Sequence, residues 1–524
     1  MWLRYSVCAA VAAALVASGS VAPAAPAAAS QAAAAHTFRI RLVGIERDGR
    51  RTAVYATIYG RNYIPIYTSG KPVQVPAGPA WIGTGIDTTG NGNEILSTTL
   101  VLRRVTISRN ATITLDARPG RQVTFALAVP GASDTGDTVQ ACVDGSFVPG
   151  APITVSGSPG SLYEVPVRSG DVSLGYASSW QDPAATLLMA GQRRGGMPKT
   201  PHFAARLASM AKIRLAFRTG TAVGGYSQLD LENNNRCSIQ QGYPIAAGQR
   251  LTQYVSAGSW QVTANGYRSF WQTTRRYSAR RGYDDTFGAA VWGPGSGLLG
   301  YQPFPSVSAA QLYFGQDDPI DDPQQDSSVC CDVSSITLSE HHHVIKHTVM
   351  SQLGNEREFS ARLPVSAMYT LKEVSKRRVP GLKVPADILS PRVSVIWRFH
   401  AAPLPDTNPN SFIPALSTAQ FLARGLTMQN QARPLGTTVL TMRLSWPARQ
   451  DFEIYQRHRL TAVRLQVSVT GGKSWHAVRL VRHGQSWRAS VQDPASGYVS
   501  LRSTVLDSGN STVQTIYRAW QVGY

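Results

Sequence analysis

The feature that most constrains the fold is a strict alternation of apolar and polar residues in short runs, repeated along most of the chain. Such alternation is typical of β-strands that bury one face. Clear examples are His36–Ile45, Arg51–Tyr59, Leu100–Ile107 and Ala111–Leu115. Turn-forming pairs separate these runs, among them Asp48-Gly49, Ser69-Gly70 and Asn91-Gly92. The pattern predicts an all-β protein of several antiparallel β-sandwich domains in tandem, with one short helix at Phe203–Met210.

The length of 524 residues is enough for several domains and too much for one ordinary core. Two segments rich in Pro, Asp, Gln, Ser or Asn, Gln316–Ser328 and Ala401–Asn410, are expected to be loops or linkers. We therefore expect four regions after the amino-terminal segment, at 36–115, 116–300, 301–425 and 432–524.

The last region has the clearest strand pattern. Six strands are expected, with hairpin turns at Gly471-Gly472 and His483-Gly484; they are Val439–Leu444, Ala462–Thr470, His476–Val481, Trp487–Val491, Tyr498–Val505 and Thr512–Val522. The side chains expected to face inward are Leu465, Val467, Trp475, Val478, Trp487, Val499 and Leu501. The region is expected to form an immunoglobulin-like or fibronectin-like sandwich that folds alone.

The amino terminus has the organisation of a secretory signal peptide. Arg4 gives a positive start, Val7–Ala17 is a short apolar core, and an Ala/Pro/Ser-rich segment with several A-x-A sites follows up to Ala35. The apolar core is shorter than the roughly 20 residues that a membrane-spanning helix needs. We expect residues 1–35 to be removed and the protein to be secreted, without a transmembrane segment.

Four cysteines follow the expected signal peptide: Cys142, Cys237, Cys330 and Cys331. An even number in an exported protein suggests two disulfides. A bond between the adjacent Cys330 and Cys331 would be strained, so each is expected to pair with Cys142 or Cys237. The alternative is four free, buried thiols.

The charge balance restricts the partners. The chain has 51 Lys+Arg against 31 Asp+Glu, a net charge of +20, although only 16% of its residues are charged. The excess therefore reflects missing carboxylates and not a basic tail. It favours an anionic cell-wall polymer, a glycan or an extracellular protein as partner.

The segment Tyr267–Tyr283 combines Arg with aromatic residues, which single-stranded nucleic acid binding also requires. It equally fits two strands with aromatic side chains inward and arginines outward. Nucleic acid is not the expected ligand, because an exported protein rarely meets it.

Two clusters contain side chains that metals use as ligands. Calcium could bind the acidic residues between Gln316 and Ser328, which are Asp317, Asp318, Asp321, Asp322 and Asp326, but their spacing is not that of an EF-hand loop. Zinc could bind His341, His343 and His347 if they lie on one strand face. A solvated acidic loop and a polar surface loop are the favoured interpretations, and no metal or cofactor is expected.

Several segments resemble the non-catalytic carboxyl-terminal region of secreted actinobacterial subtilisin-like serine proteases. The most specific are VSVTGGKSWHAV at Val467–Val478 and the stretch Ser496–Trp520, with further matches at Val105–Phe125, Tyr283–Pro294 and Arg392–Ala401. VPAG followed by Trp81-Ile82-Gly83 is similar to a strand of carboxypeptidase-regulatory or transthyretin-like domains, which implies that fold for 36–115. Ser468–Trp475 resembles an Asp-box hairpin in which Thr470 replaces the Asp, and this implies that Trp475 packs beneath the turn.

The peptidase domain of that family has no counterpart in the chain. A subtilase needs Asp in D-[ST]-G, His in H-G-T-H and Ser in G-T-S, because a base must be oriented beside the nucleophile. Asp87-Thr88-Thr89-Gly90, His483-Gly484-Gln485 and Gly436-Thr437-Thr438 each depart from these motifs, and neither G-x-S-x-G nor H-E-x-x-H occurs. The sequence favours a non-catalytic binding protein. The alternative is an accessory, regulatory or relic component of a protease system.

The first prediction is that the protein does not react as a serine hydrolase, because no activated serine is expected. A fluorophosphonate probe should not label the purified protein, while a subtilisin treated in parallel should be labelled. Labelling that disappears when a single serine is changed to alanine would contradict the prediction.

Overall fold

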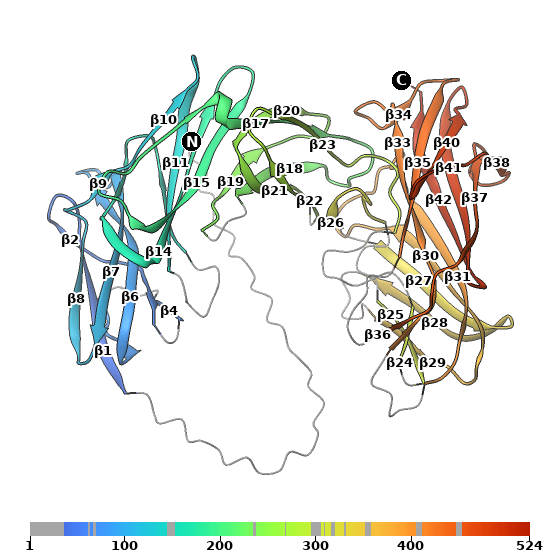
Figure 1. Cartoon of the computed structure of the whole chain (residues 1–524), viewed down its shortest axis with the longest axis horizontal. Coiled ribbons are helices and arrows are strands. Elements are labelled where there is room, and N and C mark those ends of the chain that lie inside the picture. Colours follow the sequence, from blue (N-terminus) through green and yellow to red (C-terminus); the bar gives the residue numbers. More distant parts are fainter. Residues whose placement is uncertain are drawn as a thin grey trace, which may run out of the picture.

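The computed structural model describes residues 36–60, 63–66, 70–143, 152–233, 237–267, 269–294, 305–308, 310–315, 320–329, 332–351, 358–404, 411–446 and 453–523. The expected signal peptide therefore lies outside the described residues, as do Cys330, Cys331, Asp317 and Asp318. The all-β prediction is confirmed: the described residues form mainly antiparallel sheets and contain no α-helix. The amino-terminal, middle and carboxyl-terminal parts of the chain follow one another along the long axis of the molecule (Figure 1), and the last part contains three sheets whose strands interleave in the sequence.

The predicted helix at Phe203–Met210 is wrong. Residues His202–Arg206 form strand β16, which pairs in parallel with β10 (Thr124–Ala128). Only Leu207–Ser209 are helical, as a single 3₁₀ turn. Hydrogen bonding to β10 overrides the helix propensity of the local Ala-rich sequence.

Two sheets form the first sandwich. The outer sheet has the order β2 (Arg51–Thr52), β1 (Thr37–Ile45) and β5 (Val73–Pro76), with β8 (Ala111–Asp116) parallel to β1. The second sheet has the order β4 (Tyr63–Ile66), β3 (Ala56–Tyr59), β6 (Gly78–Thr89), β7 (Ile95–Ile107), β13 (Leu162–Glu164) and β9 (Arg121–Gln122).

This second sheet is buried on both faces. On β7, Val101 packs into the core shared with the outer sheet, whereas Leu100 and Leu102 pack into a different core with strands that follow in the sequence. Three consecutive buried residues break the one-sided alternation, as expected for a strand covered on both sides. The first sandwich is therefore continuous with the middle of the chain.

The middle of the chain contains two further sheets and the disulfide. The larger has the order β12 (Ile153–Gly157), β11 (Ser133–Val143), β14 (Val167–Gln181), β15 (Thr186–Met197), β20 (Arg250–Ser256), β17 (Met210–Phe217) and β23 (Gly282–Phe287). The smaller has the order β19 (Gln240–Pro244), β18 (Tyr226–Asn233), β21 (Gly258–Gly266), β22 (Ser269–Tyr277) and β26 (Asp326–Val329).

A nine-stranded sheet dominates the carboxyl-terminal part. Its order is β28 (His343–Ser351), β27 (Asp332–Glu340), β30 (Ala367–Arg377), β31 (Arg392–Ala401), β42 (Asn510–Val522), β41 (Gly497–Asp507), β37 (Leu460–Ser468) and β38 (His476–Val478), with β34 (Gln431–Ala432) beside β42. Arg392–Arg398 of β31 pair with Ser511–Tyr517 of β42. The sheet thus takes strands from both sides of the boundary expected between 301–425 and 432–524. The independent folding of 432–524 stays a prediction.

Two small sheets cover the inner face of the nine-stranded sheet. One has the order β29 (Glu358–Arg362), β25 (Gln311–Gly315), β24 (Ser306–Ser308), β32 (Ser411–Ile413) and β36 (Glu453–Tyr455), and its Phe314 ring lies 5.2 Å from that of Trp397. The other has the order β33 (Thr418–Arg424), β35 (Thr437–Ser445), β40 (Ser486–Gln492) and β39 (Val481–His483). The Gln514 side chain on β42 exchanges two hydrogen bonds of 2.9 and 2.8 Å with the backbone of Ala419.

Buried carboxyl groups within these cores have perturbed acidities. Burial raises the pKa of Glu164 to about 8, although nearby Arg193 opposes the shift. Burial also raises the pKa of Glu373 to about 7, against hydrogen bonds from Ser375 and Ser334. At a pH between their unfolded and folded pKa values, Glu164 and Glu373 therefore stay protonated in the folded protein but are ionised in the unfolded chain.

The second prediction concerns pH. A carboxyl whose pKa is raised on folding stabilises the fold below its unfolded pKa, and that contribution is lost as the pH rises through the folded value. A tenfold difference in proton affinity between the folded and unfolded chain corresponds to about 1.4 kcal/mol. The melting temperature should fall between pH 5 and pH 8, and Glu164→Gln should flatten the fall in thermal melts. The exposed Asp171→Asn change is the control; an equal effect of both variants would contradict the prediction.

Candidate functional site: a basic face on the nine-stranded sheet

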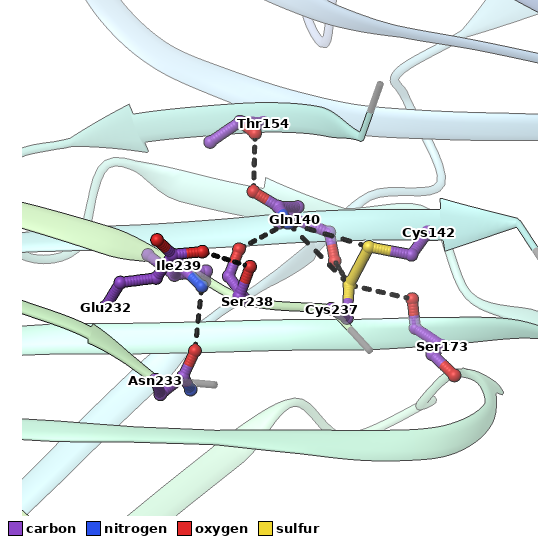
Figure 2. Close-up of a disulfide and its surroundings, with 9 residues drawn as sticks. All are labelled: Gln140, Cys142, Thr154, Ser173, Glu232, Asn233, Cys237, Ser238 and Ile239. Carbon is purple, nitrogen blue, oxygen red and sulfur yellow. Dashed lines mark hydrogen bonds between the residues drawn. A yellow bond between two sulfur atoms is a disulfide. The ribbon is translucent and has the colours of Figure 1, made fainter. Parts of the chain in front are cut away.

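The disulfide joins the two sheets of the middle region. Cys142 on β11 is bonded to Cys237, which lies just before β19, with their Cα atoms 5.7 Å apart (Figure 2). Gln140 of β11 donates a hydrogen bond of 2.7 Å to the Ser238 carbonyl and accepts one of 2.7 Å from Thr154. The expectation that Cys330 and Cys331 would take Cys142 and Cys237 as partners is wrong, because these two are bonded to each other.

The acidic segment is only partly a solvated loop. Asp321 and Asp322 are 1% and 0% exposed. Asp322 accepts hydrogen bonds from the backbone of Gly288 and Gln324, at 3.2 and 3.0 Å, and burial raises its pKa to about 7. These two side chains stabilise a turn inside the protein, so the interpretation as a solvated loop is wrong for Asp321 and Asp322.

Two further candidates from the sequence, the histidine cluster and the segment Tyr267–Tyr283, are explained by strands and the turns between them. His341, with a φ angle of 43°, lies in the turn between β27 and β28, whereas His343 and His347 lie on β28, so the three do not lie together on one strand. Within the described ranges no three His, Cys, Asp or Glu side chains are arranged to hold a metal. In Tyr267–Tyr283, Trp271 and Tyr277 are buried while Arg275 pairs with Asp285 at 2.9 Å, which agrees with the two-strand interpretation.

The outer face of the nine-stranded sheet carries an array of cations, which we call the basic face. It is formed by alternate residues of β30, β31, β41 and β37, whose intervening residues point into the core; its cations are Lys372, Lys376, Arg392, Arg398, Arg464 and Arg502. The five strands β30, β31, β42, β41 and β37 span roughly 20 Å at the usual strand spacing.

No carboxylate is present on this face among the described residues from β28 to β37. The acidic side chains of the same strands, such as Glu373, Asp332 and Asp507, are buried on the inner side. None of the six cations has an ion-pair partner within the described part of the chain. The face is therefore an uncompensated patch of positive charge.

The register places like charges next to each other. Lys376 lies directly opposite Arg392 in the antiparallel pairing of β30 with β31. Directly opposed like charges destabilise a sheet. A bound anion would relieve this repulsion between Lys376 and Arg392. The pairing therefore favours the binding of a polyanion to this face.

Aromatic rings orient two of the arginines. The guanidinium carbon of Arg392 lies 5.0 Å from the centre of the Tyr517 ring, and that of Arg502 lies 4.0 Å from the centre of the Trp475 ring. Arg502 also donates a hydrogen bond of 3.3 Å to Thr515. Such stacking holds a guanidinium in place while leaving its N–H groups able to bind.

The prediction that Trp475 lies in the core is wrong. The side chain is partly exposed and belongs to none of the core clusters of the described residues. Its Nε1 donates a 3.0 Å hydrogen bond to the Gly472 carbonyl, and Gly472 has a φ of 90° with Tyr517 packed against it. The Ser468–Trp475 hairpin thus places an aromatic ring beside the basic face. Trp487, by contrast, is buried as expected, at 7% exposure.

Sequence reasoning missed the basic face as a site. The alternate spacing of Lys372 and Lys376, or of Arg392 and Arg398, is visible in the sequence and marks the outward side of each strand. The order of the strands is not visible there, and it is the order that brings these pairs together.

No protein-family model matches the chain, and no curated protein is significantly similar to it. Among solved structures, the Bacillus anthracis TIE protein is 8% identical over 71% of this chain and 72% of its own, with a TM-score of 0.12. A tetra-tandem repeat from the extending region of a large adhesion protein is 11% identical over 84% of this chain and 99% of its own, with a TM-score of 0.14. A Salmonella alpha-2-macroglobulin mutant is 8% identical over 91% of this chain and 39% of its own, with a TM-score of 0.16. Such scores carry no argument about function, and the assignment as a multidomain β-sandwich protein rests on the sheets themselves.

The third prediction separates the two tryptophans. Trp487→Ala should lower the free energy of unfolding by about 3–5 kcal/mol, because it leaves a cavity in the core. Trp475→Ala should cost less than half as much, because its ring is partly exposed and packs on Arg502. Thermal melts of the whole chain measure both. A loss for Trp475→Ala as large as that for Trp487→Ala would contradict the placement.

Proposed function

We propose that the protein is a secreted, non-catalytic binding protein that holds a linear polyanion of the cell envelope or extracellular space on the basic face. The observation that supports this most directly is the set of six outward cations on neighbouring strands without a carboxylate among them. An open sheet face can present such cations along the length of an extended polymer.

Electrostatics explains why a polymer is the better fit than a small anion. Each solvent-exposed ion pair contributes little and is weakened by salt. Several pairs formed by one polymer add together, since the second and later contacts are made at high effective concentration. Arginine also forms paired hydrogen bonds with carboxylate and phosphate groups.

Secretion is part of the proposal. Its support is the signal-like segment 1–35 and the disulfide between Cys142 and Cys237, since disulfides persist mainly in oxidising compartments. No helical segment among the described residues has the length and hydrophobicity that a membrane crossing would require.

A second candidate function is a role beside a secreted subtilisin-like protease, as an accessory or regulatory component. It is supported by the sequence resemblance of Val467–Val478 and Ser496–Trp520. These segments form the hairpin with Trp475 and the strands β41 and β42, which carry Arg502 and Tyr517. An accessory region that anchors a protease to an anionic polymer would use the same face.

The fourth prediction tests the basic face. Replacing Lys376, Arg392 and Arg398 by Gln should weaken binding to polygalacturonate at least about tenfold, equivalent to about 1.4 kcal/mol. Binding should also weaken as NaCl is raised from about 50 to about 300 mM, because salt screens the contacts. Isothermal titration calorimetry with polygalacturonate, polyphosphate, double-stranded DNA and neutral dextran measures this.

The matched control replaces Arg39, Arg41 and Arg109 by Gln, three exposed arginines of the first sandwich. It removes the same charge from a different surface and should bind as the unmodified protein does. Equal weakening of both variants would mean that only net charge matters. A preference for DNA over both other polyanions would replace the envelope polymer with nucleic acid as the ligand.

A further inference from the structure

A cavity of about 450 Å³ lies on the first sandwich, far in sequence from the basic face. It opens between β7, β8 and the segment that leads from β13 into β14. Its lining combines Trp81, Val165 and Pro166 with Arg103, Arg104 and Arg168. The cavity thus presents both apolar and cationic groups to a ligand.

One wall of the cavity is an unpaired strand edge. Parallel pairing of β13 with β7 ends at Leu100, whose carbonyl accepts a 2.9 Å hydrogen bond from the Val165 backbone. Pro166 has no N–H to continue the ladder. From Val167 the chain pairs with Met197 of β15 instead. The pairing therefore stops where the cavity begins.

The backbone groups left at this edge point into the cavity. Thr98 donates a hydrogen bond to Ser161 and Leu100 accepts one from Val165, so alternate residues of β7 face the β13 side. The same alternation directs the N–H and C=O groups of Leu102 and Arg104 to that side. No described strand pairs with β7 there beyond Leu100.

The arginines around this edge are available to an anion. Arg103 donates a 2.7 Å hydrogen bond to the Thr114 carbonyl, and the only acidic side chain of the lining, Asp116, is paired with Arg118 at 2.7 Å. No carboxylate of the described residues lies within ion-pair distance of Arg104 or Arg168. The Arg104 guanidinium lies 5.9 Å from the centre of the Trp81 ring.

We propose that this cavity binds an extended acidic peptide, which adds as a strand beside Leu102 and Arg104 of β7. Main-chain hydrogen bonds to a free strand edge are a known mode of peptide recognition, with side-chain pockets providing specificity. Arg104 and Arg168 pair with the carboxylates of the peptide, and Trp81, Val165 and Pro166 contact an intervening apolar side chain. The cavity combines a free strand edge with cationic and apolar walls. Because only a peptide can form main-chain pairing with a strand edge, this combination favours a peptide over a sugar.

The test uses the fluorescein-labelled peptide Glu-Val-Glu-Val-Glu-Val and fluorescence anisotropy with the full chain. Saturable binding is expected, and Arg104→Ala with Arg168→Ala should weaken it at least about tenfold. The matched control, Arg109→Ala with Arg121→Ala, removes two exposed arginines outside the cavity and should not change it. The peptide with Lys in place of Glu should not bind.

Two further measurements separate this site from other anion binding. The peptide with its alternate amide nitrogens methylated keeps its charge but cannot pair with β7, so its binding should be lost. Binding should persist in the variant with Lys376, Arg392 and Arg398 changed to Gln, which separates it from the polyanion proposal. Absence of saturable binding, equal binding of the methylated peptide, or loss of binding only in the basic-face variant would each overturn the inference.

Discussion

The backbone pairing of β31 with β42 is the interaction on which the carboxyl-terminal architecture depends. It joins strands more than 100 residues apart in the chain and makes one sheet of what would otherwise be two. Lys372, Lys376, Arg392 and Arg398 come from one side of this junction, and Arg464 and Arg502 from the other. Without the pairing the six cations would be divided between two small surfaces.

Within this sheet the charges are separated by sign. Cations alternate with apolar residues and point outward, while Glu373, Asp332 and Asp507 are directed into the protein. The inward carboxyls are stabilised by neighbouring hydroxyl and imidazole groups, for example Ser375 beside Glu373 at 2.9 Å and His458 beside Asp507 at 2.7 Å. Because successive side chains of a strand point to opposite faces, cations and carboxylates that are close in the sequence lie on opposite faces of the sheet.

The alternation predicted strands such as Ala111–Leu115 and Thr512–Val522 well, because a strand buried on one face alternates apolar and polar residues in its sequence. It did not predict which strands are neighbours. The pairing of Cys142 with Cys237 was missed for that reason, as was the basic face. Phe203–Met210 was predicted as a helix, but a parallel partner strand 78 residues earlier in the sequence determined its structure, as Thr124 pairs with His202. The burial of Asp321 and Asp322 had no signal in the sequence, since an acidic cluster is normally solvated.

The position of β42 has a consequence for the order in which the protein can assemble. This strand comes last among the described strands, yet it lies in the middle of the nine-stranded sheet, between β31 and β41 (Figure 1). As a chain leaves a ribosome or an export channel from its amino terminus, β31 and β41 emerge earlier and each presents an open edge. Open edges recruit other strands, including those of neighbouring molecules. Contacts between growing chains at these edges must therefore be avoided until β42 has been made, so the arrival of β42 decides between a folded molecule and an aggregate.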